Sequence, residues 1–476
     1  MVPLVIGVYI GMKKPASFKS FFTPFFEDFH QLEDSFTVNG RTFHLEQRIQ
    51  WIFDLPCWAD MAAIKNGGYC GCPKCSTPGE FFGEGKSTIV HFPNKGKLRT
   101  HRNFVNRKDA PHHKGTEASV LEANGVDMIE HIPWDSMHAT DLGVLYIIAR
   151  SFATKLKSDY PGMGNADLTR MEATMAAARQ HQPSEFGRKF QPLSRHAYWK
   201  SSEHRNFGLF LLPIISLPLK SLEATIPAYK IFIKLFVSLR LLAYEPYASN
   251  PAWVDQAEVW LEEIVREFTD YFGPERVTLK IHSLYHIAND VRIWREPLYA
   301  HSAYGFETNI RRVKKKISAP SFPLSQIHRR IVETANVNQI LQKVKRAPLQ
   351  FYKLEPGSDD ICKYVRFRGA VISRDLKDST FKLYTGEIIK VHRVKLSPEK
   401  EAIIEAQVIS DQRALFNSTL DSRELEIFRS SLEVEPRKVS IRPADIEHKF
   451  FVMPIRDGDY GLLPMSRIGG DNFDSM

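Results

Sequence analysis

The chain has 476 residues, of which 43% are hydrophobic and 25% are charged, and its net charge is +9. A chain of this length buries a large core in two or three domains, and its composition is typical of a soluble globular protein rather than a disordered or fibrous one. Five cysteines are too few for a disulfide framework, which favours a reducing compartment, and the basic excess is compatible with a polyanionic partner.

Two apolar runs are too short or too poorly flanked to be membrane or export signals. FGLFLLPIISLPL (207–219) contains two prolines and falls short of the ~20 residues of a spanning helix, so it predicts a buried core segment. VPLVIGVYIG (2–11) has no basic n-region and no small-residue cleavage site, so it predicts a buried β-strand. Because domains usually begin with an exposed tail, we expect this sequence to begin inside a domain.

The first 65 residues predict alternating strands and helices. After the first strand, Ser17 caps a helix in which phenylalanines recur every three or four residues, and Asn39-Gly40 predicts a hairpin turn. RIQWIFDLP predicts a strand that ends at Asp54. Asp54 is then either an ordinary helix N-cap or a carboxylate at the carboxyl end of a sheet strand, where α/β folds place their chemistry.

The remainder divides into a helical part and a β-rich part. Helices are expected within 119–156, 226–244, 252–273, 282–294 and 307–318. After about residue 350, short alternating segments separated by turn residues predict a small β-rich domain.

GYCGCPKC (68–75) supplies a pair of cysteines with the spacing of a zinc site. Cys72 and Cys75 lie in a loop rich in glycine and proline, whereas a redox CxxC begins a helix, so the context favours zinc. Cys57 and Cys362 are single and no second CxxC exists. The missing ligands must therefore be histidine or aspartate.

Two pairs of residues are candidates for the missing ligands. His282 and His286 are spaced i and i+4, on one face of a helix, and Asp135 and His138 are spaced i and i+3. Structural zinc sites use mostly nitrogen and sulfur ligands, which favours the histidine pair, with Asp135 and His138 as the alternative.

Seven stretches occur in order along residues 2–335: VPLVIGVYIGMKKPASFKSFF, FDLPCWADMAAIKNGGYCGCPKC, DAPHHKG, IPWDSMHATDLGVLY, YWKSSEHRNFGLFLLP, KIHSLYHIANDV and SAYGFETNIRRVKKKI. As an ordered set they resemble the transposase of CACTA-type (En/Spm-like) DNA transposons.

The resemblance implies an RNase H-like core with a D…D…E catalytic triad. Asp54 matches the second aspartate, just upstream of the CxxC, and Glu307 matches the glutamate. The related catalytic subunit of the V(D)J recombinase has a cysteine pair and a histidine pair as zinc ligands in the same order, which supports His282 and His286. The family's DxxH motif is matched by Asp135 and His138, with no role assigned.

The resemblance also implies magnesium and DNA, in addition to the zinc that the cysteine pair predicts. Carboxylates hold two Mg²⁺ ions for phosphodiester cleavage, and zinc holds an inserted helical region on the core so that Glu307 approaches Asp54. A basic run beyond Glu307 is expected to contact DNA phosphates or to act as a nuclear import signal, so a nuclear location is expected. We expect no contact with a membrane, and a homo-oligomer remains an open alternative. The run consists of Arg311, Arg312, Lys314, Lys315 and Lys316.

The sequence departs from this family at the first aspartate. That residue belongs on a central strand upstream of VPLVIGVYIG, and the aspartates before Asp54 lie in the phenylalanine-rich helix and the loop after it. We therefore expect a transposase-derived protein that cannot cut DNA unaided or, alternatively, a non-enzymatic zinc-stabilised DNA-binding or interaction protein. The expected domains are an N-terminally truncated RNase H-like α/β core (1–120), a large helical insertion with the Glu-bearing helices (121–345) and a β-rich domain (350–476).

Overall fold

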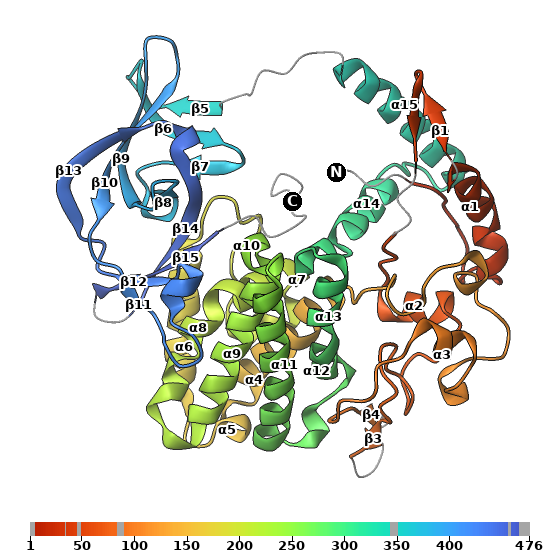
Figure 1. Cartoon of the computed structure of the whole chain (residues 1–476). Coiled ribbons are helices and arrows are strands. Elements are labelled where there is room, and N and C mark those ends of the chain that lie inside the picture. The colour runs from red at the N-terminus through yellow and green to blue at the C-terminus, as the bar shows by residue number, and fades with distance from the viewer. Residues whose placement is uncertain are drawn as a thin grey trace. The chain divides into compact units, whose positions relative to one another are not determined.

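The computed structural model describes residues 5–33, 35–44, 49–82, 90–342, 351–455 and 458–465 (Figure 1). The chain divides into two compact units, both of which are discontinuous in sequence. Unit 1 comprises Met1–Ala139, Gly273–Trp294 and His301–Arg346, and unit 2 comprises Thr140–Phe272, Arg295–Ala300 and Ala347–Met476. None of the described helices combines the length and the apolar character that crossing a lipid bilayer requires.

The described part of unit 1 consists of helices, long irregular segments and two small antiparallel strand pairs. Its helices are α1 (Phe18–Glu33), α2 (Leu55–Met61), α3 (His101–Val105), α12 (Leu279–His282), α13 (Leu284–Trp294), α14 (Tyr304–Lys314) and α15 (Pro323–Gln342). Its antiparallel pairs are β1 (Phe36–Val38) with β2 (Arg41–Phe43), and β3 (Glu80–Phe81) with β4 (Val90–His91).

The local predictions for α1 and the first hairpin are confirmed. The Ser17 hydroxyl accepts a hydrogen bond from the Ser20 N–H at 3.1 Å, which caps the helix start. Asn39 and Gly40 both have positive φ, at 52° and 75°, as a two-residue type I′ turn requires. Short-range sequence signals therefore set these two elements.

The strands predicted at 2–10 and at the segment ending in Asp54 are wrong for the described residues. Residues 5–10 and 49–54 form no strand, and the Ile6 side chain is 71% exposed. Residues 2–4 and 45–48 lie outside the described residues. A segment becomes part of a sheet only when a neighbouring strand pairs with it along a ladder of N–H and C=O groups. In the described part of unit 1 the Trp51 N–H donates to the His131 carbonyl at 2.8 Å, but no paired strand includes either segment. The sheet of an RNase H-like core is therefore not formed among the described residues.

The helical part of unit 2 surrounds the almost completely buried helix α9. Its α-helices are α4 (Tyr146–Thr154), α5 (Leu156–Asp159), α6 (Asn165–His181), α7 (Ser201–Asn206), α8 (Leu212–Ile215), α9 (Ile226–Ala243), α10 (Glu245–Ala248) and α11 (Pro251–Phe272). The predicted helices at 226–244 and 252–273 are confirmed as α9 and α11. Much of the helix expected within 119–156 is irregular, and its ordered part is the π-helical η3 (Met137–Leu145) followed by α4.

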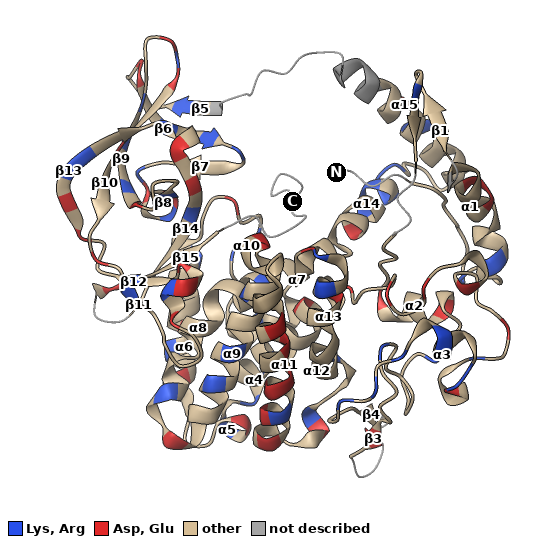
Figure 2. Ribbon diagram, viewed as in Figure 1, with Lys and Arg blue, Asp and Glu red and all other residues tan. Residues whose placement is uncertain are grey.

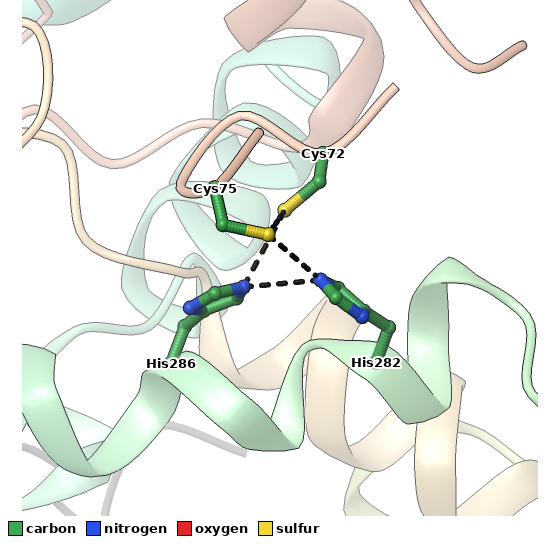
Figure 3. Close-up of side chains that lie close together, drawn as sticks. All are labelled: Cys72, Cys75, His282 and His286. Atoms are coloured by element: carbon green, nitrogen blue, oxygen red, sulfur yellow. Dashed lines mark hydrogen bonds between the residues drawn. The ribbon is translucent and has the colours of Figure 1, made fainter. Parts of the chain in front are cut away.

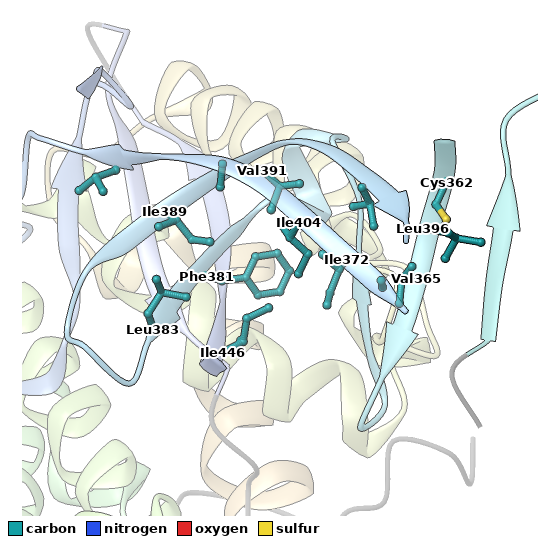
Figure 4. Packing of buried hydrophobic residues seen from close by; sticks show 14 residues of the cluster. Cys362, Val365, Ile372, Phe381, Leu383, Ile389, Val391, Leu396, Ile404 and Ile446 are labelled. Atoms are coloured by element: carbon teal, nitrogen blue, oxygen red, sulfur yellow. The ribbon is translucent and has the colours of Figure 1, made fainter. Parts of the chain in front are cut away.

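The C-terminal part of unit 2 is an antiparallel sheet, which confirms the predicted β-rich region. Its central order is β11-β12-β15-β14-β8-β9-β10-β13, and β6 pairs with β5, β7 and β9. Buried side chains such as Phe381, Ile389 and Ile404 form the core (Figure 4). The strands are β5 (Phe351–Leu354), β6 (Ile361–Phe367), β7 (Ala370–Ile372), β8 (Thr380–Leu383), β9 (Ile388–Leu396), β10 (Ala402–Ile409), β11 (Arg413–Ala414), β12 (Phe428–Ser430), β13 (Val434–Ile441), β14 (Ile446–Pro454) and β15 (Tyr460–Pro464).

Buried charged groups join the sheet to the helices of unit 2. The Arg240 guanidinium on α9 donates to the Pro464 carbonyl of β15 at 3.0 Å. Lys449 on β14 lies 2.8 Å from Glu185, in the segment after α6, and 2.5 Å from Asp378. Such groups are costly to bury without partners, so they fix one arrangement of helices and sheet within the unit.

Candidate metal centre

The cysteine pair lies in a tight loop between α2 and β3. Gly67 and Gly68 have positive φ of 79° and 72°, and a side chain at Gly71 would meet the Gly67 backbone at 2.9 Å. Only glycine fits this close approach without displacing the backbone. The glycines therefore allow the loop to fold back so that Cys72 and Cys75 share one side of it.

The histidine pair comes from two consecutive short helices about 200 residues later in the chain. His282 ends α12 and His286 lies in the first turn of α13. The His282 Nδ1 lies 3.0 Å from the Phe92 carbonyl oxygen, so Nδ1 carries the proton and the Nε2 lone pair faces the cysteines. A backbone carbonyl thus orients His282 in the way that metal-binding histidines are usually oriented.

The four side chains converge with the dimensions of a tetrahedral site (Figure 3). The two sulfurs are 3.6 Å apart and the two Nε2 atoms 3.2 Å apart. The Cys72 sulfur is 3.4 Å from His286 Nε2, and the Cys75 sulfur is 3.3 Å from His282 Nε2. A zinc ion with ordinary bond lengths places two sulfurs about 3.8 Å apart and two nitrogens about 3.3 Å apart. The donor set and its spacing therefore fit one metal ion such as zinc.

The burial and the pKa shifts of the two cysteines and two histidines are consistent with a bound cation. All four side chains are at most 1% exposed. Burial raises the pKa of the Cys72 thiol, whereas the hydrogen bond between the two sulfurs is the main cause that lowers the pKa of Cys75, against the opposing effect of burial. Burial also lowers the pKa of His286, so this imidazole remains neutral. The Cys75 thiol therefore loses its proton more easily than the Cys72 thiol, and a bound cation such as zinc would allow both thiols to ionise.

A buried ion pair connects the same two segments, and the sequence did not single it out. Lys74, between the two cysteines, is 2.8 Å from Asp290, one helical turn beyond His286 on α13. Lys74 also donates to the Ile129 carbonyl at 2.6 Å, and the second Asp290 oxygen accepts from the Trp134 N–H at 2.8 Å. A lysine inside the CxxC and an aspartate at i+4 from the second histidine were the available signals.

The alternative ligands lie outside the metal group and form their own contact. The Asp135 carboxylate accepts hydrogen bonds from the Met137 N–H at 3.0 Å, from the Ala303 N–H at 2.9 Å and from the His138 ring. Both carboxylate oxygens are thus engaged. Ala303 immediately precedes α14, so Asp135 fixes the start of the helix that carries Glu307.

Asp54 and Glu307, the expected catalytic carboxylates, both lie within electrostatic reach of His138. The hydrogen bond to Asp135 is the main cause that raises the pKa of His138, and the charges of Asp54 and Glu307 raise it further. Asp54 also caps α2, because its Oδ1 accepts from the Cys57 N–H at 2.8 Å. Glu307 is exposed in the first turn of α14.

The predicted DNA-contacting residues form the basic end of α14 and the turn that follows it (Figure 2). Arg311, Arg312, Lys314 and Lys315 are exposed, while Lys316 is half-buried and donates to the Thr334 hydroxyl of α15 at 3.1 Å. Four cations thus face solvent, and the fifth braces α14 against α15.

Comparison with known proteins finds a match for the C-terminal sheet. A family model described as a domain of unknown function (DUF8592) matches residues 344–465. No curated protein and no solved structure matches the chain. The matched segment contains β5–β15, whereas the metal-binding group lies outside it.

Proposed function

We propose that this chain binds DNA as a zinc-stabilised protein derived from a DDE-class transposase. The observation that carries the proposal is the convergence of Cys72, Cys75, His282 and His286 in one buried tetrahedral group. The catalytic subunit of the V(D)J recombinase, which is related to the CACTA-type transposases that this sequence resembles, has a cysteine pair and a histidine pair as zinc ligands in the same order. The electrostatic proximity of Asp54 and Glu307 to the same histidine adds support.

The distribution of charge along the chain supports DNA as the partner. Residues 273–350 contain 14 of the 64 Lys and Arg residues but only 5 of the 55 Asp and Glu residues, which leaves 50 of each sign in the rest of the chain. The whole excess of +9 therefore lies in the segment that carries the two histidine ligands, Glu307 and the basic end of α14. A concentrated basic segment is typical of contact with phosphates.

The carboxylates support binding without cleavage by this chain alone. Phosphodiester cleavage in this class uses two Mg²⁺ ions held by carboxylates. The residues that match the triad are Asp54 and Glu307, two carboxylates rather than three, and Asp54 also accepts a hydrogen bond from the α2 backbone. We expect a nicking assay with the purified chain and Mg²⁺ to show no turnover, and robust cleavage would contradict this.

Salt-dependent binding tests the main proposal. In a fluorescence anisotropy titration with duplex DNA, replacing both Arg311 and Lys315 with alanine should weaken binding and reduce the slope of log K against log salt by about 2, because each lost phosphate contact removes about 0.9. The matched control replaces Lys363 and Arg366, two exposed residues of β6, and should leave the slope unchanged. Equal effects of the two double variants, or no salt-dependent binding at all, would refute the proposal.

The nuclear location and the alternative function follow from the same features. A basic run of this kind also serves as an import signal, so we place the protein in the nucleus. If the chain binds zinc but not DNA, the alternative is a zinc-stabilised protein-interaction module. Residues 351–476 carry 20 Lys and Arg and 21 Asp and Glu, so this segment has no basic excess of its own and is the better candidate for a protein contact.

A further inference from the structure

The turn between α14 and α15 is held rigidly by one side chain. The Gln326 amide oxygen accepts from the N–H groups of Ser318 and Ala319 at 2.9 and 3.2 Å. Its amide nitrogen donates to the carbonyls of Ala319 and Ser321 at 2.9 and 2.6 Å. Four hydrogen bonds to the turn backbone from one residue of α15 give this segment a defined shape, although it lies on the surface.

Phe322, at the end of this turn, is both exposed and conformationally unfavourable. Its side chain is 80% exposed and its φ is +50°. A bulky residue rarely adopts positive φ, and a residue before proline, here Pro323, normally adopts an extended conformation. Strained residues of this kind are found mainly at binding and catalytic sites.

The Phe322 ring does not stabilise the chain by packing against α15. An apolar residue at a helix start contributes by packing against the first turns of that helix, and a ring exposed to 80% does not do so. Glycine would adopt the same backbone conformation without strain. Packing of the ring against α15 therefore does not explain why a phenylalanine occupies this strained position, which leaves the ring available to a partner molecule.

The surroundings of Phe322 indicate a polyanionic partner. Lys314 and Lys315 precede the turn and are exposed. On α15, Arg329 and Arg330 are exposed and form ion pairs with Glu333 at 2.9 and 3.0 Å, so they contribute less free charge than the lysines. The cations of α14 and a protruding ring on a rigid turn combine the two elements of single-strand recognition, phosphate contact and base stacking.

We propose that Phe322 stacks on a DNA base that is unpaired or displaced from the duplex, while the basic end of α14 contacts the adjacent phosphates. This inference rests on the proposed DNA-binding function and adds the substrate class, DNA with locally open base pairs. Apolar side chains that insert between or beside bases act in this way in other DNA-binding proteins. The face of a base is the ligand, so no particular sequence is required.

Comparison of paired and locally unpaired DNA tests this inference. Anisotropy titrations would use the full chain with a fully paired duplex and with the same duplex containing a short mismatched bubble. The wild-type chain should prefer the bubble by roughly 5- to 100-fold, the range expected for stacking of one base. Phe322→Gly should abolish that preference without altering the salt slope, because no phosphate contact is lost, and Phe322→Trp should retain it.

The controls separate this inference from the proposed function and from self-association. Tyr384→Gly removes another exposed aromatic side chain, 64% exposed, and should leave the preference intact. If wild-type binding is salt-dependent but shows no bubble preference, or if Phe322→Gly keeps the preference, the stacking inference is wrong and DNA binding stands. If Phe322→Gly alters the sedimenting mass instead, the ring serves contact between copies and the inference is likewise overturned. Absence of any DNA binding overturns both.

Discussion

Loss of the metal should destabilise unit 1 selectively, and Cys75→Ser tests this directly. Cys75 and His282 are 207 residues apart in sequence and their ligand atoms are 3.3 Å apart. If the ion is treated as a cross-link, it closes a loop of this length and reduces the conformational entropy of the unfolded chain. This contributes about 5 kcal/mol to the free energy of unfolding at 25 °C. Folded domains are typically stable by only about 5–15 kcal/mol, so this single contribution is a large fraction of the total.

The Lys74–Asp290 ion pair would not replace the metal. It joins the same loop to α13, but a buried pair contributes little net stability because its desolvation offsets its attraction. We therefore expect Cys75→Ser to lower the free energy of unfolding of unit 1 by roughly 5 kcal/mol or more, or to leave it unfolded at 37 °C. Unit 2 contains none of the four ligands, so calorimetry should show a second transition that is unchanged.

The assay is metal analysis combined with differential scanning calorimetry. Wild-type protein purified without chelator should contain one zinc per chain, and Cys75→Ser should contain essentially none. Cys57→Ser is the matched control, because Cys57 is a half-buried free thiol outside the group, and it should keep both the zinc and the wild-type transitions. Wild-type protein without bound metal, or a Cys75→Ser variant that still binds one zinc with an unchanged melting curve, would refute the reasoning.

Three further perturbations test individual contacts. Lys74→Met leaves the Asp290 carboxylate buried without its ion-pair partner, so it should lower the free energy of unfolding, measured by urea denaturation, by about 3–5 kcal/mol. A decrease below about 1 kcal/mol would contradict a tightly buried pair. Asp54→Ala removes the α2 cap and should cost about 1 kcal/mol, whereas Asp54→Asn should restore most of it in the same assay, and equal losses would argue against capping. Burial lowers the pKa of His448 from 6.5 to about 4. As the pH falls, His448 therefore binds a proton in the unfolded chain before it does so in the folded chain. The free energy of unfolding of the wild type should fall by roughly 3 kcal/mol between pH 6.5 and pH 4. His448→Gln should reduce the dependence of the melting temperature on pH. The control His392→Gln, on the exposed side of β9, should leave that dependence unchanged. The reverse result would be incompatible with a buried neutral His448.

Sequence alone identified the elements that local chemistry determines. The Asn39-Gly40 turn follows from backbone conformations that these two residues adopt easily, and α1 follows from the spacing of its phenylalanines. The zinc ligands could be predicted because the spacing in CxxC, and in HxxxH on a helix, brings the two donor side chains of each motif within reach of one metal ion. The order of the motifs along the chain then favoured the histidine pair. Asp54 shows the limit of such patterns, because its N-cap role was one of two readings until its contact with the Cys57 N–H was seen.

Contacts between distant segments could not be read from the sequence. The sequences at 2–10 and before Asp54 satisfy the pattern of buried strands, but a strand also needs a neighbouring strand, and the described part of unit 1 provides no paired strand for residues 5–10 or 49–54. The Lys74–Asp290 pair spans 216 residues, and the Arg240–Pro464 contact, which joins the helices to the sheet, spans 224. No local pattern specifies such pairs, because each residue is chemically ordinary until the fold buries it beside the other.

The sequence by itself therefore determined the ligand chemistry, the concentration of positive charge in residues 273–350 and the existence of a C-terminal sheet, because residue type and short-range spacing are sufficient for each. Only the tertiary structure decided that Asp135 supports the helix carrying Glu307, that Lys316 braces α15, and that Phe322 is exposed on a rigid turn. These properties depend on burial and on partners far away in the chain, and both are set by the fold as a whole.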